Sequence, residues 1–316
     1  MTPSMLIDCV TPNAALDRTL VVPGYQQGGV FRPQKMILAA GGKGINVARA
    51  AAVLGGKARC FGFVAGHSGR LLTDLAVHEG LLCRFTPLAA GETRTCTILA
   101  DPDLGMTTLV NEAGAATAAL DWARLRADLL ADAEPRMICF CGSLPPGSPL
   151  DSFAELLGDC AAAGHSVWVD TSGAALMTAS KVRGVNLKVN DEEASALTGA
   201  PITSPETAAA TASHLAAASG AFAVITLGKD GAILVAGGRA WLAKPPHIAV
   251  KSAVGSGDSF LAGLLVALGA GETPQTALRM AAAAGAANAQ SYGGGQFTLE
   301  SFRAAFEATT LTPVAG

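Results

Sequence analysis

Short apolar runs alternate with longer helical patterns along most of the chain, and this alternation limits the possible folds more than any other feature. The runs are rich in Val, Ile and Leu, as buried strands are, and occupy 5–10, 58–64, 136–142, 166–170, 185–190 and 222–228. Helical patterns separate most of them, at 45–56, 120–133, 152–164 and 206–220, and several end at a glycine. The alternation predicts an α/β fold with a mostly parallel sheet and helices on both faces.

Two stretches depart from this alternation, at 17–42 and 92–114. Each has the pattern of paired strands joined by a turn, without a helix between them. We expect them to form one small antiparallel sheet, a lid with bounds of about 12–40 and 92–114. It would cover the strand ends, where open α/β sheets bind ligands. Because the sequence shows no linker, charge block or internal repeat, residues 1–316 are expected to form one core domain with this lid inserted.

Charge and hydropathy exclude some classes of partner. A formal net charge of −3 over 316 residues gives no basic field for nucleic acid. No apolar run reaches the ~20 residues of a membrane helix, and the start lacks the pattern of a signal peptide, so we expect a cytoplasmic protein without a membrane partner. The seven cysteines include no C-x-x-C pair and the five histidines form no spaced cluster, which favours buried free thiols over a metal or redox site.

A glycine-rich turn that contains a carboxylate, "GSGD" at 255–258, precedes an apolar helical pattern. Consecutive backbone amides at a helix start stabilise the negative charge of a transferring phosphoryl group. A carboxylate there cannot bind phosphate, but it can take a proton from a hydroxyl that attacks phosphorus. The alternative is an ordinary Asp that caps a helix. Neither the dinucleotide fingerprint nor the P-loop pattern occurs, which argues against a nicotinamide dehydrogenase.

Five motifs, in order along the chain, resemble those of one family. "GSGDSF" (255–260) resembles the G-A-G-D-x-F signature of ribokinase-like carbohydrate kinases, and "AAGGKGINVARAAAVLGG" (39–56) resembles their glycine-rich N-terminal signature. "TPNAALD" (11–17), "GSLPPG" (142–147) and "LKVNDEE" (187–193) resemble motifs of the phosphofructokinase B branch. The resemblance covers essentially the whole chain and implies a ribokinase-like three-layer α/β/α core, with a mostly parallel sheet and a small β-sheet lid.

The resemblance also implies roles for individual residues. Asp258 would be the catalytic base, with the amides of Gly255, Ser256 and Gly257 as the anion hole. The sugar would contact Asp17, Gly42, Lys43 and Asn46, with Arg94 on its phosphate and Ser143 beside it. The nucleotide would contact Lys188, Asn190, Thr226, Gly228 and Gly231, and Asn190 and Glu193 would organise Mg²⁺ through water.

Each of these residues also has a structural alternative. Asp17 suits a turn of the lid, and "GGKG" suits a helix start with a solvated lysine. Arg94 lies on a probable strand where exposed arginines are common, and "SLPPG" forms a good turn around Ser143. "NDEE" suits a helix N-cap with acids in its first turn, a role compatible with Mg²⁺ binding. Ser252 and Ala253 replace the Asp-Thr that the wider family associates with a monovalent-cation site, so the sequence does not decide whether potassium activates the protein.

The implied activity is an ATP-dependent, Mg²⁺-dependent phosphoryl transfer to a primary hydroxyl of a ketohexose phosphate. Fructose 1-phosphate is the expected acceptor, because "GGKGINVARA" and "GETRT" most resemble 1-phosphofructokinases. Fructose 6-phosphate and tagatose 6-phosphate are the alternatives, and a sugar-phosphate-binding protein without catalysis is a more distant one. We also expect a homodimer formed through the lid.

Overall fold

The computed structural model describes residues 5–314, which contain a ten-stranded sheet and a separate four-stranded sheet. The large sheet has the order β14-β13-β12-β11-β10-β9-β8-β1-β4-β5. Its strands are β1 (Ile7–Asn13), β4 (Ala58–Val64), β5 (Leu82–Pro87), β8 (Met137–Cys141), β9 (Ser166–Asp170), β10 (Val185–Asn190), β11 (Ala223–Thr226), β12 (Ala232–Ala236), β13 (Arg239–Lys244) and β14 (Thr310–Val314).

All neighbouring strands from β11 to β5 pair in parallel, which confirms the predicted mostly parallel sheet. The three strands at the other edge, β12, β13 and β14, pair antiparallel. The sequence analysis did not identify this edge. Its last strand is short, exposed and contains Pro313, a residue that sheets accept at their edges because it donates no hydrogen bond.

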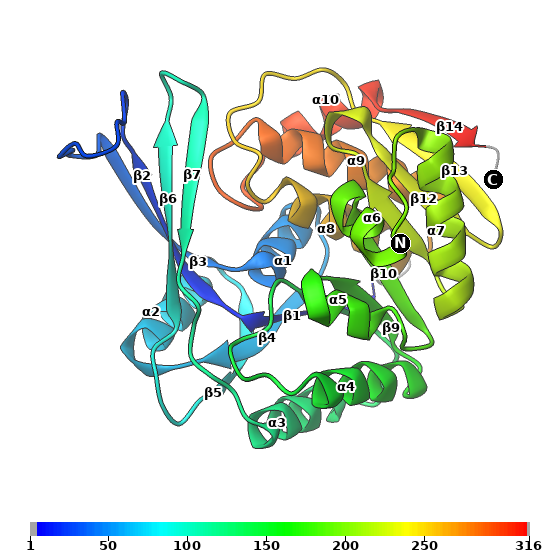
Figure 1. Cartoon of the computed structure of the whole chain (residues 1–316), viewed down its shortest axis with the longest axis horizontal. Coiled ribbons are helices and arrows are strands. Elements are labelled where there is room, and N and C mark those ends of the chain that lie inside the picture. The colour runs from blue at the N-terminus through cyan, green and yellow to red at the C-terminus, as the bar shows by residue number, and fades with distance from the viewer. Residues whose placement is uncertain (1–4, 315–316) are drawn as a thin grey trace.

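Helices cover both faces of the large sheet and complete three layers (Figure 1). One face packs on α3 (Ala119–Leu130), α4 (Leu150–Ala162), α5 (Gly173–Ala179), α6 (Asp191–Thr198) and α7 (Pro205–Ser219). The other packs on α1 (Lys43–Val53), α2 (Gly66–His78), α8 (Ser256–Gly269) and α9 (Pro274–Ala289). The helix α10 (Leu299–Ala308) packs on α9, and a short 3-10 turn, η1 (Gly228–Asp230), follows β11.

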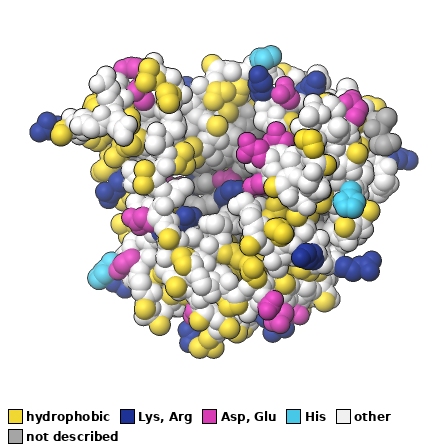
Figure 2. Space-filling view, viewed as in Figure 1, with side chains coloured by type: hydrophobic (Ala, Val, Ile, Leu, Met, Phe, Trp, Pro, Cys, Tyr) yellow, Lys and Arg dark blue, Asp and Glu magenta, His cyan; other side chains and the backbone are white. Residues whose placement is uncertain are grey.

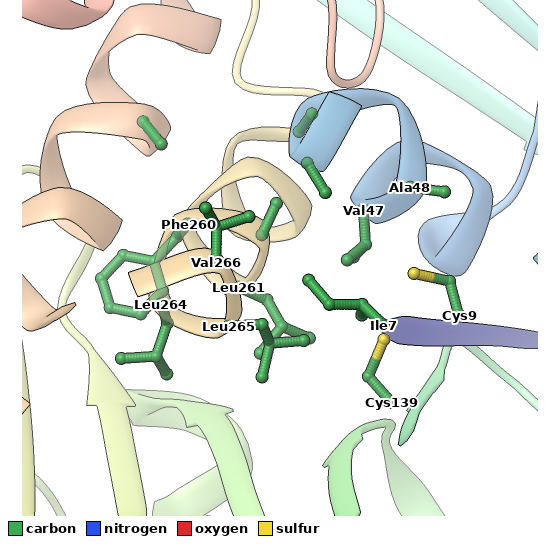
Figure 3. Packing of buried hydrophobic residues seen from close by; sticks show 14 of the residues in the cluster. Ile7, Cys9, Val47, Ala48, Cys139, Phe260, Leu261, Leu264, Leu265 and Val266 are labelled. Carbon is green, nitrogen blue, oxygen red and sulfur yellow. The ribbon is translucent and has the colours of Figure 1, made fainter. Parts of the chain in front are cut away.

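Helix α8 is largely enclosed within this second layer. Every residue from Asp258 to Ala267 is buried. Its apolar side chains, including Leu261 and Leu265, lie near Ile7 of β1 and Val47 of α1 (Figure 3). A helix packed on several sides is fixed in direction by its core contacts. The position of its N-terminus at the sheet edge is therefore set by the core.

The small sheet has the order β3-β2-β6-β7 and stands off the larger one (Figure 1). It consists of β2 (Ala15–Val21), β3 (Lys35–Gly41), β6 (Arg94–Asp101) and β7 (Met106–Asn111), which fall within the two stretches that the sequence singled out. The sheet is mixed and not purely antiparallel as expected, because β2 and β6 pair in parallel. Both strands leave the large sheet at the same edge, starting at Ala15 and Arg94, and so run in one direction.

Four cysteines lie side by side across neighbouring strands of the large sheet. Cys9 is in register with Cys60 and Cys139, and Cys60 is in register with Cys83. All seven cysteines are free and six are buried, which agrees with the expected buried thiols. Over residues 5–314, no helix combines the length and the apolar character needed to cross a membrane.

Candidate active site

The carboxyl ends of the parallel strands meet the N-terminus of α8. Gly255 precedes the helix in the left-handed region (φ 77°), and no side chain caps the helix start. A Cβ on Gly255 would lie 2.3 Å from Cα of Gly294, so only glycine fits both the angle and the space. The amide of Ser256 donates to the carbonyl of Ala253 at 3.2 Å within the turn. Of the three predicted anion-hole residues, Ser256 therefore has its amide engaged inside the turn.

Asp258 lies in the first turn of α8 with 6% of its surface exposed. Its Oδ2 accepts a hydrogen bond of 2.8 Å from Nδ2 of Asn46 on α1. Burial raises the pKa of Asp258 above its ordinary value, and Lys43 opposes this rise. The carboxylate is thus a stronger base than a solvent-exposed aspartate, and it is oriented by a side chain from another helix.

Asp170, at the carboxyl end of β9, binds both lysines of the predicted site. Nζ of Lys43 lies 2.8 Å from its Oδ1, and Nζ of Lys188 lies 2.6 Å from its Oδ2. Burial alone would raise the pKa of Asp170, but Lys188 and Lys43 outweigh it and lower the pKa to about 2. Asp170 in turn raises the pKa of Lys43 against the effect of burial. A Cβ on Gly257 would lie 3.0 Å from Nζ of Lys188, so this ammonium group reaches the α8 turn.

Asp17 lies on the face of the small sheet that is turned toward α1. With Asn46, Arg49 and Gly294 it lines a cavity of about 30 Å³ between the small sheet, α1 and the loop after α9. Burial raises the pKa of Asp17 to about 6, although Arg49 and Arg94 lower it. Gly41 is the last residue of β3, the strand that pairs with β2. A Cβ on Gly41 would lie 2.1 Å from Cγ of Asp17, so a larger residue there would displace this side chain.

Arg94 and Ser143 both contact Asn13, the last residue of β1. Nε and Nη2 of Arg94 donate to the carbonyl of Asn13 at 3.1 and 2.9 Å. Nδ2 of Asn13 lies 3.3 Å from Oγ of Ser143. Gly42, which precedes α1, has φ 106°, and a Cβ there would lie 2.6 Å from Cγ2 of Thr11. The predicted sugar-site residues are therefore all placed around the junction of β1, α1 and the small sheet.

Asn190 and Glu193 form a reciprocal cap at the start of α6. Glu193 N donates to Oδ1 of Asn190 at 2.7 Å, and Asn190 N donates to Oε2 of Glu193 at 2.9 Å. The predicted N-cap is confirmed. Within the described part of the chain, no group of three or more His, Cys, Asp and Glu residues is arranged to bind a metal ion. Asn190 and Glu193 nevertheless present amide and carboxylate oxygens, a donor set that suits Mg²⁺ held through its waters.

A second, larger cavity of about 400 Å³ lies on the other side of the α8 turn. The predicted nucleotide residues Thr226, Gly228 and Gly231 line it together with Ser256 and Gly257. The sequence analysis did not identify the rest of its lining, which is mainly apolar and includes Pro245, Pro246, Ile248, Val250, Phe260 and Ala286. Size and lining suit a flat heterocycle such as adenine. Figure 2 shows the molecule in the view of Figure 1, with a hollow beside the small sheet that contains acidic and basic side chains.

Solved structures with high similarity confirm a ribokinase-like fold. The structure of phosphofructokinase-2 from Escherichia coli in complex with fructose-6-phosphate superposes with a TM-score of 0.89, at 26% identity over 96% of this chain and 98% of that chain. A putative ribokinase from Agrobacterium tumefaciens has the same fold, with a TM-score of 0.77 at 18% identity over 96% of this chain and 98% of that one.

The family follows from the sequence comparisons. A model described as pfkB family carbohydrate kinase matches residues 8–301. The chain is 34% identical to a 1-phosphofructokinase of Rhodobacter capsulatus over 267 residues, 83% of each chain, and 31% identical to that of Escherichia coli K12 over 284 residues, 90% of each chain. The chain belongs to the pfkB family of carbohydrate kinases, which makes it a phosphotransferase with an alcohol group as acceptor.

The sequence analysis missed two residues that organise the site. Asp170 ends the strand pattern "SVWVD", and a carboxylate directly after a buried strand is a signal that could have identified it. Arg49, buried on α1, contacts Asn46 and lines the same cavity as Asp17. Its helical position alone does not distinguish it from a solvated arginine, because three of its four acceptors lie outside α1, on Ala40, Glu79 and Gly294.

The raised pKa of Asp17 predicts a pH-dependent cost to stability. A carboxyl group whose pKa rises from 3.8 to about 6 on folding destabilises the folded state as pH increases through that window. Asp17→Asn keeps an acceptor but removes the charge. It should raise the free energy of unfolding at pH 7.5 by on the order of 3 kcal/mol and leave it nearly unchanged at pH 4.

Urea unfolding at the two pH values measures this difference. The exposed Asp74 on α2 provides the matched control, and Asp74→Asn should show no such pH-dependent gain. An Asp17→Asn protein with equal stability gain at both pH values, or with none, would show that Asp17 is not destabilised by burial.

Proposed function

We propose that the protein is an ATP-dependent, Mg²⁺-dependent kinase that converts fructose 1-phosphate to fructose 1,6-bisphosphate. One observation carries the proposal. Asn46, which donates to the buried carboxylate of Asp258, lines one cavity with Asp17, and Gly257, which precedes Asp258 at the start of α8, lines a larger cavity with Thr226. A base between an acceptor site and a nucleotide site is the arrangement that phosphoryl transfer requires.

In the proposed mechanism Asp258 accepts the proton of the attacking primary hydroxyl. Its raised pKa favours this transfer, and Asn46 orients the receiving oxygen. The dipole of α8 and the amide of Gly257 stabilise the charge that develops on the phosphoryl group, and Lys188 lies beside that amide. Asn190 and Glu193 are the residues that would organise the waters of Mg²⁺, which would supply positive charge to the nucleotide phosphates.

Arg94 is the proposed partner of the phosphate already on the sugar. It lies close enough to Asp17 to lower the pKa of that carboxyl, and it donates to the carbonyl of Asn13. A guanidinium binds phosphate with two parallel hydrogen bonds. Relatives from Rhodobacter capsulatus and Escherichia coli named 1-phosphofructokinase favour fructose 1-phosphate. The high structural similarity to phosphofructokinase-2 with fructose-6-phosphate makes that sugar the second candidate, and tagatose 6-phosphate is the third.

The first test is ADP release with MgATP and four acceptors: fructose 1-phosphate, fructose 6-phosphate, tagatose 6-phosphate and free fructose. We expect kcat/KM for fructose 1-phosphate to exceed the others at least tenfold, about 1.4 kcal/mol of transition-state discrimination. Arg94→Gln should raise KM for the phosphosugar and leave KM for ATP unchanged. A preference for free fructose would contradict the role of Arg94, and no turnover would favour a binding protein without catalysis.

The role of Asp258 is tested by Asp258→Asn, which keeps the size of the side chain but cannot accept the proton. We expect kcat to fall about 10²–10⁴-fold with little change in either KM. In the wild type, kcat/KM should rise with pH through a midpoint above 3.8, because only ionised Asp258 acts as a base and burial raises its pKa. Asp74→Asn is the surface control. An Asp258→Asn enzyme with wild-type kcat would refute the assignment.

We further propose that the small sheet is both a lid, which excludes water from the bound nucleotide, and a dimer surface. Side chains alternate between the two faces along each strand. Asp17 and Ile98 face the cavity, so the residues next to them in sequence face outward. The outward side chains Leu20, Met36, Leu99 and Val110 are in part or largely exposed. Clustered apolar side chains on an exposed sheet face are typical of a subunit contact.

Light scattering after size exclusion tests the dimer. The wild type should have twice the mass of one chain, and Val110→Lys combined with Leu99→Lys should yield a monomer, because buried unpaired charges oppose association. Leu120→Lys, an exposed site on α3, is the control and should stay dimeric. A monomeric wild type, or a dimeric double variant, would contradict this proposal.

A further inference from the structure

Arg49 lies one turn after Asn46 on α1 and has 9% of its surface exposed. Its guanidinium donates four hydrogen bonds: to the carbonyls of Ala40 (2.7 Å) and Gly294 (2.8 Å), to Oδ1 of Asn46 (2.9 Å), and from Nε to Oε2 of Glu79 (2.5 Å). These partners come from the small sheet, the loop after α9, α1 and the end of α2. One buried cation thus joins four segments beside the site.

The contact with Asn46 decides which way that amide faces. Oδ1 of Asn46 accepts from Arg49, while Nδ2 donates to Asp258 at 2.8 Å. A reversed amide would set its oxygen against the carboxylate of Asp258 and its NH₂ group against the guanidinium, and both contacts would be repulsive. We infer that Arg49 is a positioning residue for phosphoryl transfer, one that fixes the Asn46 amide and through it the carboxylate of Asp258; the inference rests on the proposed function.

The contact with Gly294 extends the same support to the α8 turn. Gly294 packs directly on Gly255, where a Cβ would lie 2.3 Å from the Gly294 Cα. A Cβ on Gly294 would lie 2.4 Å from the side chain of Asn46. The loop carbonyl that Arg49 binds therefore belongs to the segment that backs the turn. A planar guanidinium with donors in several directions can make all these contacts, and a lysine cannot.

A double-mutant cycle between Arg49 and Asn46 tests the inference. Arg49→Gln should lower kcat at least about tenfold, because a small displacement of the base has a large effect on rate. If Arg49 acts through Asn46, Arg49→Gln in an Asn46→Ala background should change kcat by less than about twofold. KM for ATP should stay within about twofold of the wild type in each variant. If the losses in kcat of the two single variants multiply in the double variant, Arg49 and Asn46 act independently and the inference is overturned.

The controls separate positioning from general stability. Arg279→Gln removes another partly buried arginine that binds backbone carbonyls, those of Glu307 and Thr309, and it should retain wild-type kcat. If Arg49→Gln does not fold, Arg49→Lys replaces it in the same cycle, since it keeps a charge beside Glu79 but lacks the planar group. A wild type inactive on every sugar phosphate would instead overturn the proposed function, and this inference with it.

Discussion

The carboxylate of Asp170 is the interaction on which the rest of the site depends. It is 1% exposed, lies at the end of a central strand, and accepts hydrogen bonds from both Lys43 and Lys188. A buried charge is tolerated only when it is paired, and here two cations stabilise one anion. Lys43 also faces the carboxylate of Asp258, while the Lys188 ammonium group lies beside the start of α8, close to Gly257. Asp170 therefore fixes both lysines at the edge where the large sheet meets α8.

Close contacts made by glycines set the shape of the site around Asp170 and its two lysines. Gly255 packs on Gly294, Gly294 packs on Asn46, and Gly41 packs on Asp17. At each of these glycines a Cβ would lie within 2.5 Å of a neighbouring atom. The neighbouring group therefore occupies the space that a side chain would need. The result is a site whose polar groups approach one another closely without intervening bulk. The apolar packing of α8 on α1 and the sheet holds these groups in position.

The sequence predicted most of the large sheet, since runs such as "MICFC" and "SVWVD" are unambiguous buried strands flanked by helical patterns. It also located the turn at 255–258 and the two stretches of the small sheet. The parallel pairing of β2 with β6 was not predictable from local pattern, because it depends on where each strand leaves the large sheet. The contacts of Asp170 and Arg49 were not predictable for a related reason. Their partners, such as Lys188 and the carbonyl of Gly294, are distant in sequence, so no local spacing marks these contacts, although the place of Asp170 at the end of a buried strand could have marked it as a candidate.

Two of the connections between the small sheet and the core are very short. Only Ala14 separates β1 from β2, and only Gly42 separates β3 from α1. One residue offers two soft dihedral angles, so a rotation of the small sheet must be absorbed at Ala14 and Gly42 themselves. Gly42 directly precedes Lys43. A change in the orientation of the small sheet at Gly42 would therefore also change the torsion angles that direct Lys43.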